Sequence, residues 1–321
     1  MRYRSLLPMS GVFVSAFTLI AMTQAVIGIA PANAHSDSLP LGDGHVSTKK
    51  SSKGSVFACH AGNPNAGGAQ SNVPWIHGSK WNPAEKPAVS GQVEWPNASF
   101  TETTTSTYRR LVTAGVPVGS TTGTFPIADT DPVYAFDHNP NSIKSSATTV
   151  KIPAKPKVAA HVSCLPSGSI GMMTNGVALF NALDGPGRDA EAHEVQDSCS
   201  GHPERNGTYH YHSGSACLLS NATGRSTLIG YANDGFGIYV ERKANGKLLT
   251  NTSLDKCHGR TSRISWDGKK VKKYHYVVTA EYPYTLGCFR GTATTTGNSS
   301  PAGAPSGNGG GLPPPPFRTI A

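Results

Sequence analysis

The chain lacks long stretches in which apolar residues recur with the period of an amphipathic helix, and only 15% of its 321 residues are charged. It has neither a phosphate-binding loop nor a dinucleotide-binding glycine fingerprint, which argues against nucleotide chemistry. It also lacks the G-x-S-x-G motif that presents a nucleophilic serine in many hydrolases. Beyond the N-terminal apolar run, no segment is long and apolar enough to span a bilayer. We therefore expect neither a large helical domain nor a nucleotide-dependent enzyme.

What the chain has instead is a series of short β-branched or aromatic segments bounded by Gly, Pro and Asn. The dipeptides Asn206-Gly207, Asn245-Gly246 and Asp267-Gly268 favour tight type I′ hairpin turns. Residues 190–196 are the best candidate for a short helix. We predict a mainly β domain with little helix, an antiparallel sandwich or barrel. The expected strands cover residues 89–95, 150–152, 158–162, 176–180, 236–240 and 274–279.

The N-terminal 34 residues have the pattern of a secretory signal peptide. Arg2 and Arg4 precede an apolar run over residues 12–29, and Pro31-Ala32-Asn33-Ala34 ends in the small-x-small pattern that a signal peptidase cleaves. The alternative is an uncleaved membrane anchor, which the polar residues within the run disfavour. We therefore expect cleavage after Ala34 and a secreted or periplasmic/extracellular protein.

Composition divides the rest of the chain into three regions. Residues 35–55 are rich in Ser, Gly, Lys and Asp and are predicted to be a flexible spacer. Residues 292–321 are dominated by Gly, Pro, Ser and Thr and are predicted to be a disordered tail. Residues 56–291 are long enough to form one β domain with a substantial core.

The net charge is +9, and part of the basic surplus lies at one predicted hairpin, at Lys269, Lys270, Lys272 and Lys273. Such a patch could bind an anionic polymer or a cell-envelope component, although a solubilising surface is the simpler interpretation. No specific nucleic acid partner is expected.

Two parts of the predicted domain resemble each other. Residues 170–177 align with residues 229–236, and the run from Cys199 to His202 parallels the run from Cys257 to Arg260. Each run is followed by a hairpin turn, a Tyr-His-Tyr strand and a closing cysteine. We predict two related units, at about residues 170–217 and 229–288, packed about a pseudo-twofold axis.

The chain has six cysteines, an even number that in an exported protein favours disulfides over thiolate metal ligands. Fifteen pairings are possible. The duplication favours one of them, in which the two bridges of the repeats bracket the Tyr-His-Tyr strands. The expected pairs are Cys199 with Cys217, Cys257 with Cys288, and Cys59 with Cys164.

The sequence Tyr209-His210-Tyr211-His212 places both imidazoles on one face of a strand, where they form a chelating pair suited to Zn or Cu. Tyr209 and Tyr211 point to the opposite face and would lock the strand in place. The alternative is that these histidines donate hydrogen bonds to buried carbonyls and bind no ion. Three imidazole nitrogens within about 4 Å of a common point would favour the metal. Further ligands or supporting groups would come from His202, His258, His275, His193, Asp197 or Asp234.

A second pattern, His193-Glu194-Val195-Gln196-Asp197, resembles the helical zinc motif H-E-x-x-H with Asp in place of the second His. In that interpretation Glu194 would be a general base. A polar helical turn before a disulfide is the simpler explanation of the pattern.

With these residues in view, the chain resembles the YHYH-domain proteins, exported bacterial and some eukaryotic proteins named for the tetrapeptide found here at residues 209–212. The resemblance implies no established activity. Family members often have His where this chain has Val277 and Glu where it has Lys256, which favours one metal site near His210 and His212 over two symmetric ones. The resemblance covers residues 59–291 and includes residues 123–126 (GTFP), 139–143 (NPNSI), 175–177 (NGV), 199–202 (CSGH), 230–236 (GYANDGF), 254–257 (LDKC) and 282–288 (YPYTLGC).

We interpret the chain as a secreted protein of unestablished activity with a His-rich Cu or Zn site on the Tyr-His-Tyr-His strand. One alternative is a non-catalytic envelope or matrix protein that binds its partner through the basic β-surface. Another is a metal-dependent hydrolase. The sequence names no substrate.

Overall fold

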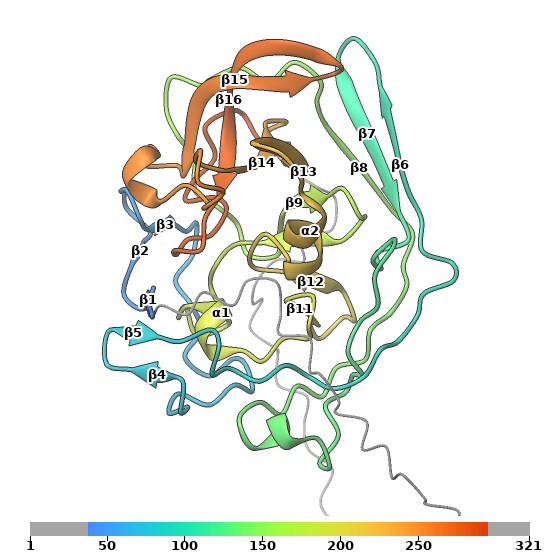
Figure 1. The fold of residues 1–321 in the computed structure, drawn as a ribbon, viewed down its shortest axis with the longest axis vertical. Helices are drawn as coiled ribbons and strands as arrows, with labels where there is room; N and C mark the ends of the chain where they lie inside the picture. Colours follow the sequence, from blue (N-terminus) through green and yellow to red (C-terminus); the bar gives the residue numbers. More distant parts are fainter. Residues whose placement is uncertain (1–37, 295–321) are drawn as a thin grey trace, which may run out of the picture. The chain divides into compact units, whose positions relative to one another are not determined.

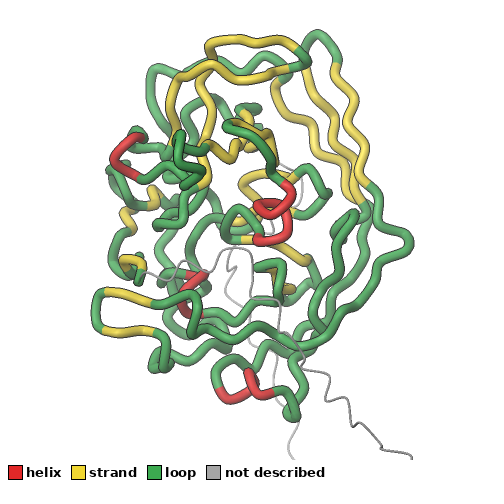
Figure 2. The backbone as a smooth tube through the Cα atoms, in the orientation of Figure 1, coloured by secondary structure: helices red, strands yellow, loops and turns green. Residues whose placement is uncertain are grey.

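The structure of the protein is a computed structural model that describes residues 38–294. The expected signal peptide and nearly all of the expected tail lie outside the described residues. Strands joined by long loops dominate, and helices are short (Figure 2), so the mainly β class is confirmed. The helical elements are η1 (Pro132–Ala135), α1 (Ala190–His193), α2 (Ala216–Asn221) and η2 (Asn251–Ser253). The strands are β1 (Leu39–Pro40), β2 (Val46–Ser47), β3 (Val56–Phe57), β4 (Ile76–His77), β5 (Lys80–Trp81), β6 (Phe100–Thr104), β7 (Tyr108–Thr113), β8 (Thr148–Pro153), β9 (Ser169–Met173), β10 (Ala178–Phe180), β11 (Gly201–Pro203), β12 (Tyr209–Tyr211), β13 (Ser226–Ala232), β14 (Gly237–Glu241), β15 (Gly259–Trp266) and β16 (Lys269–Val278).

The largest sheet has eight strands in the order β11-β12-β10-β9-β13-β14-β16-β15 (Figure 1). Strands β9 and β13 pair antiparallel at its middle. Outward from them, each half has an antiparallel partner (β10 or β14), then a parallel strand (β12 or β16), then an antiparallel edge strand (β11 or β15). The two halves therefore repeat the same pairing in the same order, as expected of two related units about a pseudo-twofold axis.

The parallel pairs β10–β12 and β14–β16 depart from the purely antiparallel arrangement that we expected. A parallel pair requires a crossover connection, because a two-residue turn can join only antiparallel strands. The first crossover, between β10 and β12, contains α1 and β11, and the second contains η2 and β15. The first crossover is important for the site, because it brings residues 181–203 back to β12.

A separate sheet, β6-β7-β8, packs along one face of the large sheet. Leu111 and Ile152 from this small sheet bury their side chains against Tyr231 and Tyr239. Arg109 is 1% exposed, and its guanidinium lies 4.6 Å from the centroid of the Tyr231 ring. The other face of the large sheet carries the main core, which contains Ile170, Val177, Tyr209, Tyr211, Phe236, Ile238 and Tyr276. The large sheet is thus buried on both faces.

The expectation of a flexible spacer at residues 35–55 is wrong from residue 38 onward. Strand β1 pairs with β5, and β2 pairs with β3. The backbone N–H of Gly42 donates to Asp189 Oδ2 at 2.8 Å, and a Cβ at Gly42 would lie 2.2 Å from the Tyr282 ring. The few apolar residues of the segment, including Leu39 and Val46, pack on the core. The polar composition of the segment did not indicate these contacts, because many of them are hydrogen bonds of the backbone.

Two of the expected strands do not form. Val89 and Val93 make isolated bridges, and residues 158–162 contain no strand, with Val158 49% exposed. These segments have strand-forming residues but lack a neighbouring strand of sufficient length. Strand β6 was not among the expected strands, because its Thr-rich segment is exposed and carries no apolar alternation.

The hairpin turns also differ in type from the prediction. Only Asp267-Gly268 has positive φ at both positions, 48° and 75°, as a type I′ turn requires. At Asn206-Gly207 only the glycine has positive φ, and the N–H of Gly207 donates to Glu204 O at 2.8 Å. This is a type I turn followed by a bulge, the common solution for a slightly longer hairpin loop.

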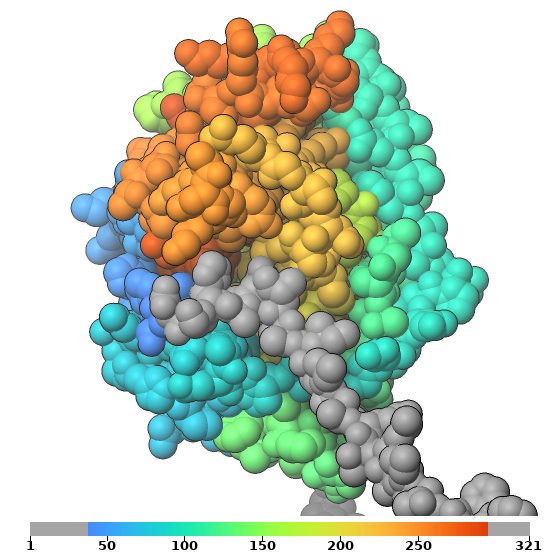
Figure 3. All heavy atoms as spheres, viewed as in Figure 1, coloured from blue at the N-terminus to red at the C-terminus, as the bar shows by residue number. Residues whose placement is uncertain are grey.

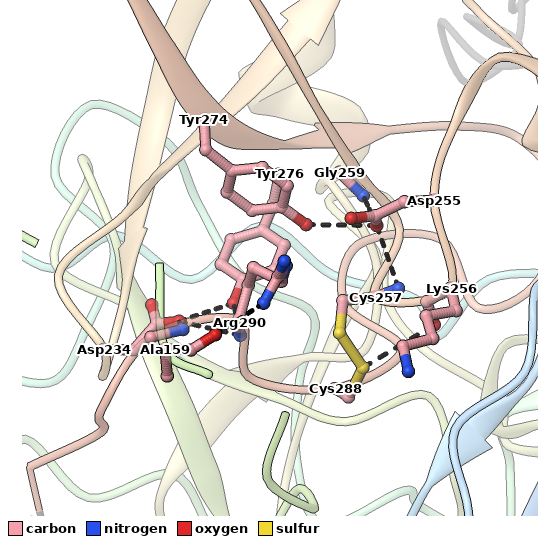
Figure 4. Close-up of a disulfide and its surroundings, with 11 residues drawn as sticks. Ala159, Asp234, Asp255, Lys256, Cys257, Gly259, Tyr274, Tyr276, Cys288 and Arg290 are labelled. Carbon is pink, nitrogen blue, oxygen red and sulfur yellow. Dashed lines mark hydrogen bonds between the residues drawn. A yellow bond between two sulfur atoms is a disulfide. The ribbon is translucent and has the colours of Figure 1, made fainter. Parts of the chain in front are cut away.

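The six cysteines form the three expected disulfides, Cys59–Cys164, Cys199–Cys217 and Cys257–Cys288. The second closes a segment that contains β11 and β12, and the third closes one that contains β15 and β16. Figure 4 shows the Cys257–Cys288 bridge with the hydrogen-bonded side chains around it. Each half of the large sheet therefore has its own covalent link at the same place.

Candidate metal centre

The hairpin formed by β11 and β12 brings two histidines together. In its register His202 lies directly opposite His210, and Gly201 lies opposite Tyr211. Directly opposed residues of an antiparallel pair have neighbouring Cβ atoms on the same face. Because side chains alternate along a strand, His212 follows His210 on that face. Local strand geometry therefore gathers all three imidazoles.

Backbone carbonyls fix the orientation of two of these rings. His210 Nδ1 lies 3.0 Å from Thr208 O, and His212 Nδ1 lies 2.5 Å from Asn181 O. A carbonyl oxygen only accepts, so in each ring Nδ1 carries the proton and Nε2 presents a lone pair. The two Nε2 atoms face each other at 3.1 Å. These carbonyl contacts are the alternative to metal binding that the sequence raised. Contacts of this kind also orient the ligating histidines of known metal sites.

The geometry of the cluster fits a bound ion. Two nitrogens bound to one tetrahedral Zn at about 2.0–2.1 Å lie about 3.3–3.4 Å apart. The His210–His212 separation of 3.1 Å is close to this value. The ligand atoms of His202, His210 and His212 all lie within 4.8 Å of one another. Neither ring nitrogen of His202 has a hydrogen-bond partner among the described residues, so this ring can turn toward an ion without losing one.

A carboxylate completes the cluster. Glu194, directly after α1, places Oε2 3.3 Å from His212 Nε2 and 3.4 Å from His202 Nε2. This oxygen has no hydrogen-bond partner within residues 38–294. When Glu194 is ionised, its oxygen and the two oriented Nε2 atoms are all acceptors, and they converge with no protein donor between them among residues 38–294. Such a donor set is suited to a cation.

Burial keeps the histidines neutral. It lowers the pKa of His212 to about 4 and, together with the neighbouring imidazoles, holds the pKa of His202 well below its usual value. Burial likewise lowers the pKa of His210 and raises the pKa of Glu194. Neutral imidazole is the form that binds metals. A bound cation would favour the ionised carboxylate and so reverse the shift of Glu194.

The cluster lies at the wall of a cleft with a volume of about 720 Å³. The Phe180 ring stacks on His210, with centroids 3.9 Å apart, and covers one side of it. Structural zinc sites are closed, whereas catalytic sites keep one position open. A cluster at the wall of a cleft leaves room for such an open position. Among the polar residues that line the cleft are His60, His138, Asn139, Asn141, Asn181 and Arg205.

Tyr209 and Tyr211 support the strand from its other face, where both are fully buried. The Tyr209 hydroxyl donates to Asp197, with distances of 2.8 and 3.0 Å to the two carboxylate oxygens, and Asn175 Nδ2 donates to the Tyr211 oxygen at 3.0 Å. Asp197 also accepts from the backbone N–H of Gly123. Asp197 is therefore a supporting residue placed away from the imidazoles.

The remaining predicted residues lie outside the cluster. His193 Nε2 pairs with Asp43 at 2.9 Å. In the second repeat, Asp234 accepts from the Tyr276 hydroxyl at 2.6 Å, and both ring nitrogens of His258 have protein partners. His275 Nε2 faces Glu241 Oε1 at 3.3 Å.

The motif that resembled H-E-x-x-H is thus divided. Helix α1 ends at His193, so His193 and Asp197 do not share a helical face. Only Glu194 reaches the cluster, where its carboxylate faces His202 and His212. The sequence suggested Glu194 through a motif that does not exist in the structure.

The fold and the site together define a mainly β, disulfide-linked protein with a histidine-lined cleft. Residues 149–249 match the family model described as YHYH protein. This match supports the assignment of that segment to the YHYH-domain family. The matched segment contains Glu194 and all three clustered histidines but ends before β15 and β16. No match was found among curated proteins or among solved structures.

Proposed function

We propose that the protein binds one Zn or Cu ion through His202, His210 and His212, with Glu194 facing the ion. The observation that carries this proposal is the pair of Nε2 lone pairs that converge at 3.1 Å, each oriented by a carbonyl on the opposite side of its ring. Without a cation or a shared proton, two acceptors at this distance repel each other. Three neutral imidazoles and one carboxylate are a donor set that both ions accept.

The cleft favours a reactive ion over a purely structural one, and we propose a metal-dependent hydrolytic reaction as its chemistry. When bound, the ion would supply Lewis acidity at the cleft wall. Glu194 would hold or move a proton at Oε2, an atom that is buried and has no competing hydrogen bond among the described residues. Phe180 and the buried face of β12 would limit the access of water to one side.

Metal analysis of protein purified without an affinity tag tests the ion itself. We expect about one equivalent of Zn or Cu per chain, lost in the His210→Ala, His212→Ala double variant. The matched control is His275→Ala, which removes the imidazole at the equivalent position of the second repeat and should leave the ion bound. A wild-type protein without a stoichiometric ion after incubation with Zn²⁺ or Cu²⁺ would contradict the proposal. So would equal loss of the ion in the control.

Glu194→Gln separates capture of the ion from chemistry. We expect this variant to keep one equivalent of metal, because the three imidazoles remain, and to lose any hydrolytic turnover found for the wild type. Complete loss of the ion would instead identify Glu194 as an essential ligand.

We further propose that the protein is exported. Three disulfides within residues 38–294 are typical of an oxidising compartment. In this part of the chain, no helix meets the length and hydrophobicity needed to cross a membrane. N-terminal sequencing of the mature protein should give His35 as the first residue, and retention of Met1 would contradict cleavage.

A second candidate function rests on the hairpin β15–β16. Lys270, Lys272 and Arg263 are exposed, and Arg263 pairs in register with Lys272, so like charges lie side by side. This hairpin is the dark orange surface that projects in Figure 3. Such a patch could bind an anionic polymer, as an alternative or an addition to the metal function.

Retention of the metal-free protein on dextran sulfate tests this candidate. Binding should be lost when Lys269, Lys270, Lys272 and Lys273 are replaced by Gln, and kept when Lys49, Lys50 and Lys53 are replaced instead. If both variants bind equally, the charges only protect the exposed edge strand β15 from pairing with other chains.

A further inference from the structure

A second cavity, of about 130 Å³, lies apart from the histidine cleft. Its wall is built from β1, β5, the loop after β5, α1 and α2. Much of this wall is apolar and includes Leu39, Pro83, Ala216, Leu219 and Leu248. The volume is similar to that of an engineered apolar cavity of about 150 Å³ that holds benzene. A small organic molecule therefore fits the space.

Two buried polar atoms on this wall have no hydrogen-bond partner among residues 38–294. They are Nε1 of Trp81, a donor, and Oε1 of Glu191, an acceptor when ionised. Trp81 is 4% exposed and Glu191 is 8% exposed. A buried polar group that lacks a partner destabilises the folded state, so a ligand that satisfies both atoms would gain affinity from each.

A lysine adds a charge to the same wall. Lys86 Nζ donates to the carbonyl of Glu191 at 2.5 Å and to Gln196 Oε1, which leaves one of its three N–H donors. It lies 5.8 Å from the centroid of the Trp81 ring, so Lys86 and Trp81 can serve one ligand group. Within the described residues Lys86 forms no ion pair with any carboxylate. A positive and a negative charge thus line one apolar cavity without neutralising each other directly.

Burial disfavours the charged form of both groups more strongly than their mutual attraction and the Ser213 hydrogen bond to Glu191 favour it. It lowers the pKa of Lys86 and raises the pKa of Glu191. Ligand charges of opposite sign would favour the ionised forms of both side chains.

We propose that this cavity binds an α-amino acid with a short aliphatic side chain. The ligand ammonium would meet Glu191 Oε1, and its carboxylate would accept from Lys86 Nζ and Trp81 Nε1. Its side chain would pack on Leu219 and Leu248. A zwitterion places an ammonium and a carboxylate on either side of one carbon, which matches an acidic and a basic group on one small wall.

Calorimetric titration of the wild-type protein with L-leucine, N-acetyl-L-leucine and L-leucinamide tests the ligand class. The acetyl group removes the ammonium, and the amide removes the carboxylate. We expect leucine to bind at least about tenfold more tightly than either analogue. The proposal is overturned if leucine shows no binding at about 10 mM, or if either analogue binds as well as leucine. Leucinamide that binds as well as leucine would point to a peptide N-terminus as the occupant.

Two variants that remove the charge of Glu191 or of Lys86 test whether these side chains bind the ligand. Glu191→Gln and Lys86→Met should each weaken leucine binding at least about tenfold. The matched controls Glu85→Gln and Lys80→Met change charges on neighbouring exposed positions and should bind like the wild type. Leucine affinity unchanged in both cavity variants would overturn the proposal. If either variant fails to fold by circular dichroism, the comparison of ligands on the wild type decides alone.

This proposal does not depend on the metal centre. The Zn or Cu content of Glu191→Gln and Lys86→Met should stay at the wild-type level, and the His210→Ala, His212→Ala variant should still bind leucine. Failure of one proposal therefore leaves the other standing.

Discussion

The two repeats share a scaffold and differ in what they hold. In the first, Tyr209 donates to Asp197, whose Oδ1 also accepts from the N–H groups of Cys199 and Gly201. In the second, Tyr274 donates to Asp255, whose Oδ1 accepts from the N–H groups of Cys257 and Gly259 (Figure 4). The backbone beneath the Tyr-His-Tyr strand is therefore the same in both.

On the opposite face the side chains diverge. The positions of His202, His210 and His212 are taken by Arg260, His275 and Val277 in the second repeat. Arg260 Nε lies 3.6 Å from Glu241 Oε2, and His275 Nε2 lies 3.3 Å from Glu241 Oε1. The guanidinium supplies the positive charge beside the carboxylate. The carboxylate of the second repeat is thus balanced by a side chain of that repeat, whereas no Lys or Arg of the described residues pairs with Glu194 in the first.

The comparison shows that the scaffold alone does not make a metal site. Two positions, 260 and 277, decide whether the strand gathers lone pairs or an ion pair. The following experiments change residues in one repeat and compare the effect with the other repeat, beginning with the largest expected effect.

Converting the second site should create a metal centre. The Arg260→His, Val277→His double variant lacks the guanidinium of Arg260 and has imidazoles at positions 260, 275 and 277 that face Glu241. We expect a second equivalent of Zn²⁺ to bind about a thousandfold more tightly than to the wild type, a difference on the order of 4 kcal/mol. Metal titration followed by elemental analysis measures it. Val277→His alone retains Arg260 and serves as the control. A stoichiometry that stays at one equivalent would show that the repeats differ in more than these two residues.

Removing one disulfide at a time should separate stability from site geometry. The bridges Cys199–Cys217 and Cys257–Cys288 close segments of 18 and 31 residues. Each Cys→Ala pair should lower the free energy of unfolding by about 3 kcal/mol, the longer segment slightly more. Urea unfolding measures this loss.

Only the Cys199→Ala, Cys217→Ala variant should weaken metal binding, because that bridge closes the segment of β11 and β12. Equal weakening in both variants would mean that the two halves of the sheet do not hold their sites independently.

Protonation of His258 should account for part of the loss of folding stability at acid pH. The counterpart of His258 in the first repeat is Ser200. Both have positive φ, 69° and 63°. Burial lowers the pKa of His258 to about 4 from its ordinary 6.5. As the pH falls below 6.5, the unfolded chain takes up the proton first, so stability is lost between pH 6.5 and about 4 and is unaffected above.

The metal-free His258→Asn variant keeps a residue that tolerates positive φ and removes this titration. Between pH 7 and 4.5 the wild type should lose about 2–3 kcal/mol more than the variant in urea unfolding. Parallel losses in the two proteins would refute the assignment.

The smallest effect is expected from the supporting phenols. Tyr209→Phe and Tyr274→Phe each remove a hydroxyl that donates to an aspartate, Asp197 or Asp255, and should cost about 1–2 kcal/mol of stability. Thermal unfolding measures the loss of stability. Metal titration should show weaker metal binding only for Tyr209→Phe. If Tyr274→Phe changes metal affinity equally, the support is shared across the sheet.

Much of the site could be predicted because it is local. The alternation of Tyr and His places His210 and His212 on one face. His202 was one of several candidate further ligands, and a two-residue turn at Asn206-Gly207 would have placed it opposite Tyr211. The longer loop of the structure places it opposite His210. The same local logic led to His258 and His275 as ligands, and it failed there. Their partners, Thr285 and Glu241, come from other parts of the chain, and no local pattern specifies them.

The fold class could be predicted for a similar reason, from short strand segments and turn residues. The exceptions were segments whose state depends on a neighbour. Strand β6 forms from exposed threonines because β7 lies beside it, whereas residues 158–162 have better strand formers and no adjacent strand.

The sequence by itself determined that this protein is mainly β, cross-linked and internally repeated, and that His210 and His212 share a strand face. These properties follow from backbone alternation, turn geometry and the spacing of like residues, which act over a few positions. Only the tertiary structure decided that Glu194 and the Asn181 carbonyl reach those histidines, and that Arg260 neutralises the second copy. Such encounters depend on how the crossover connections pack, which is set by burial over the whole domain.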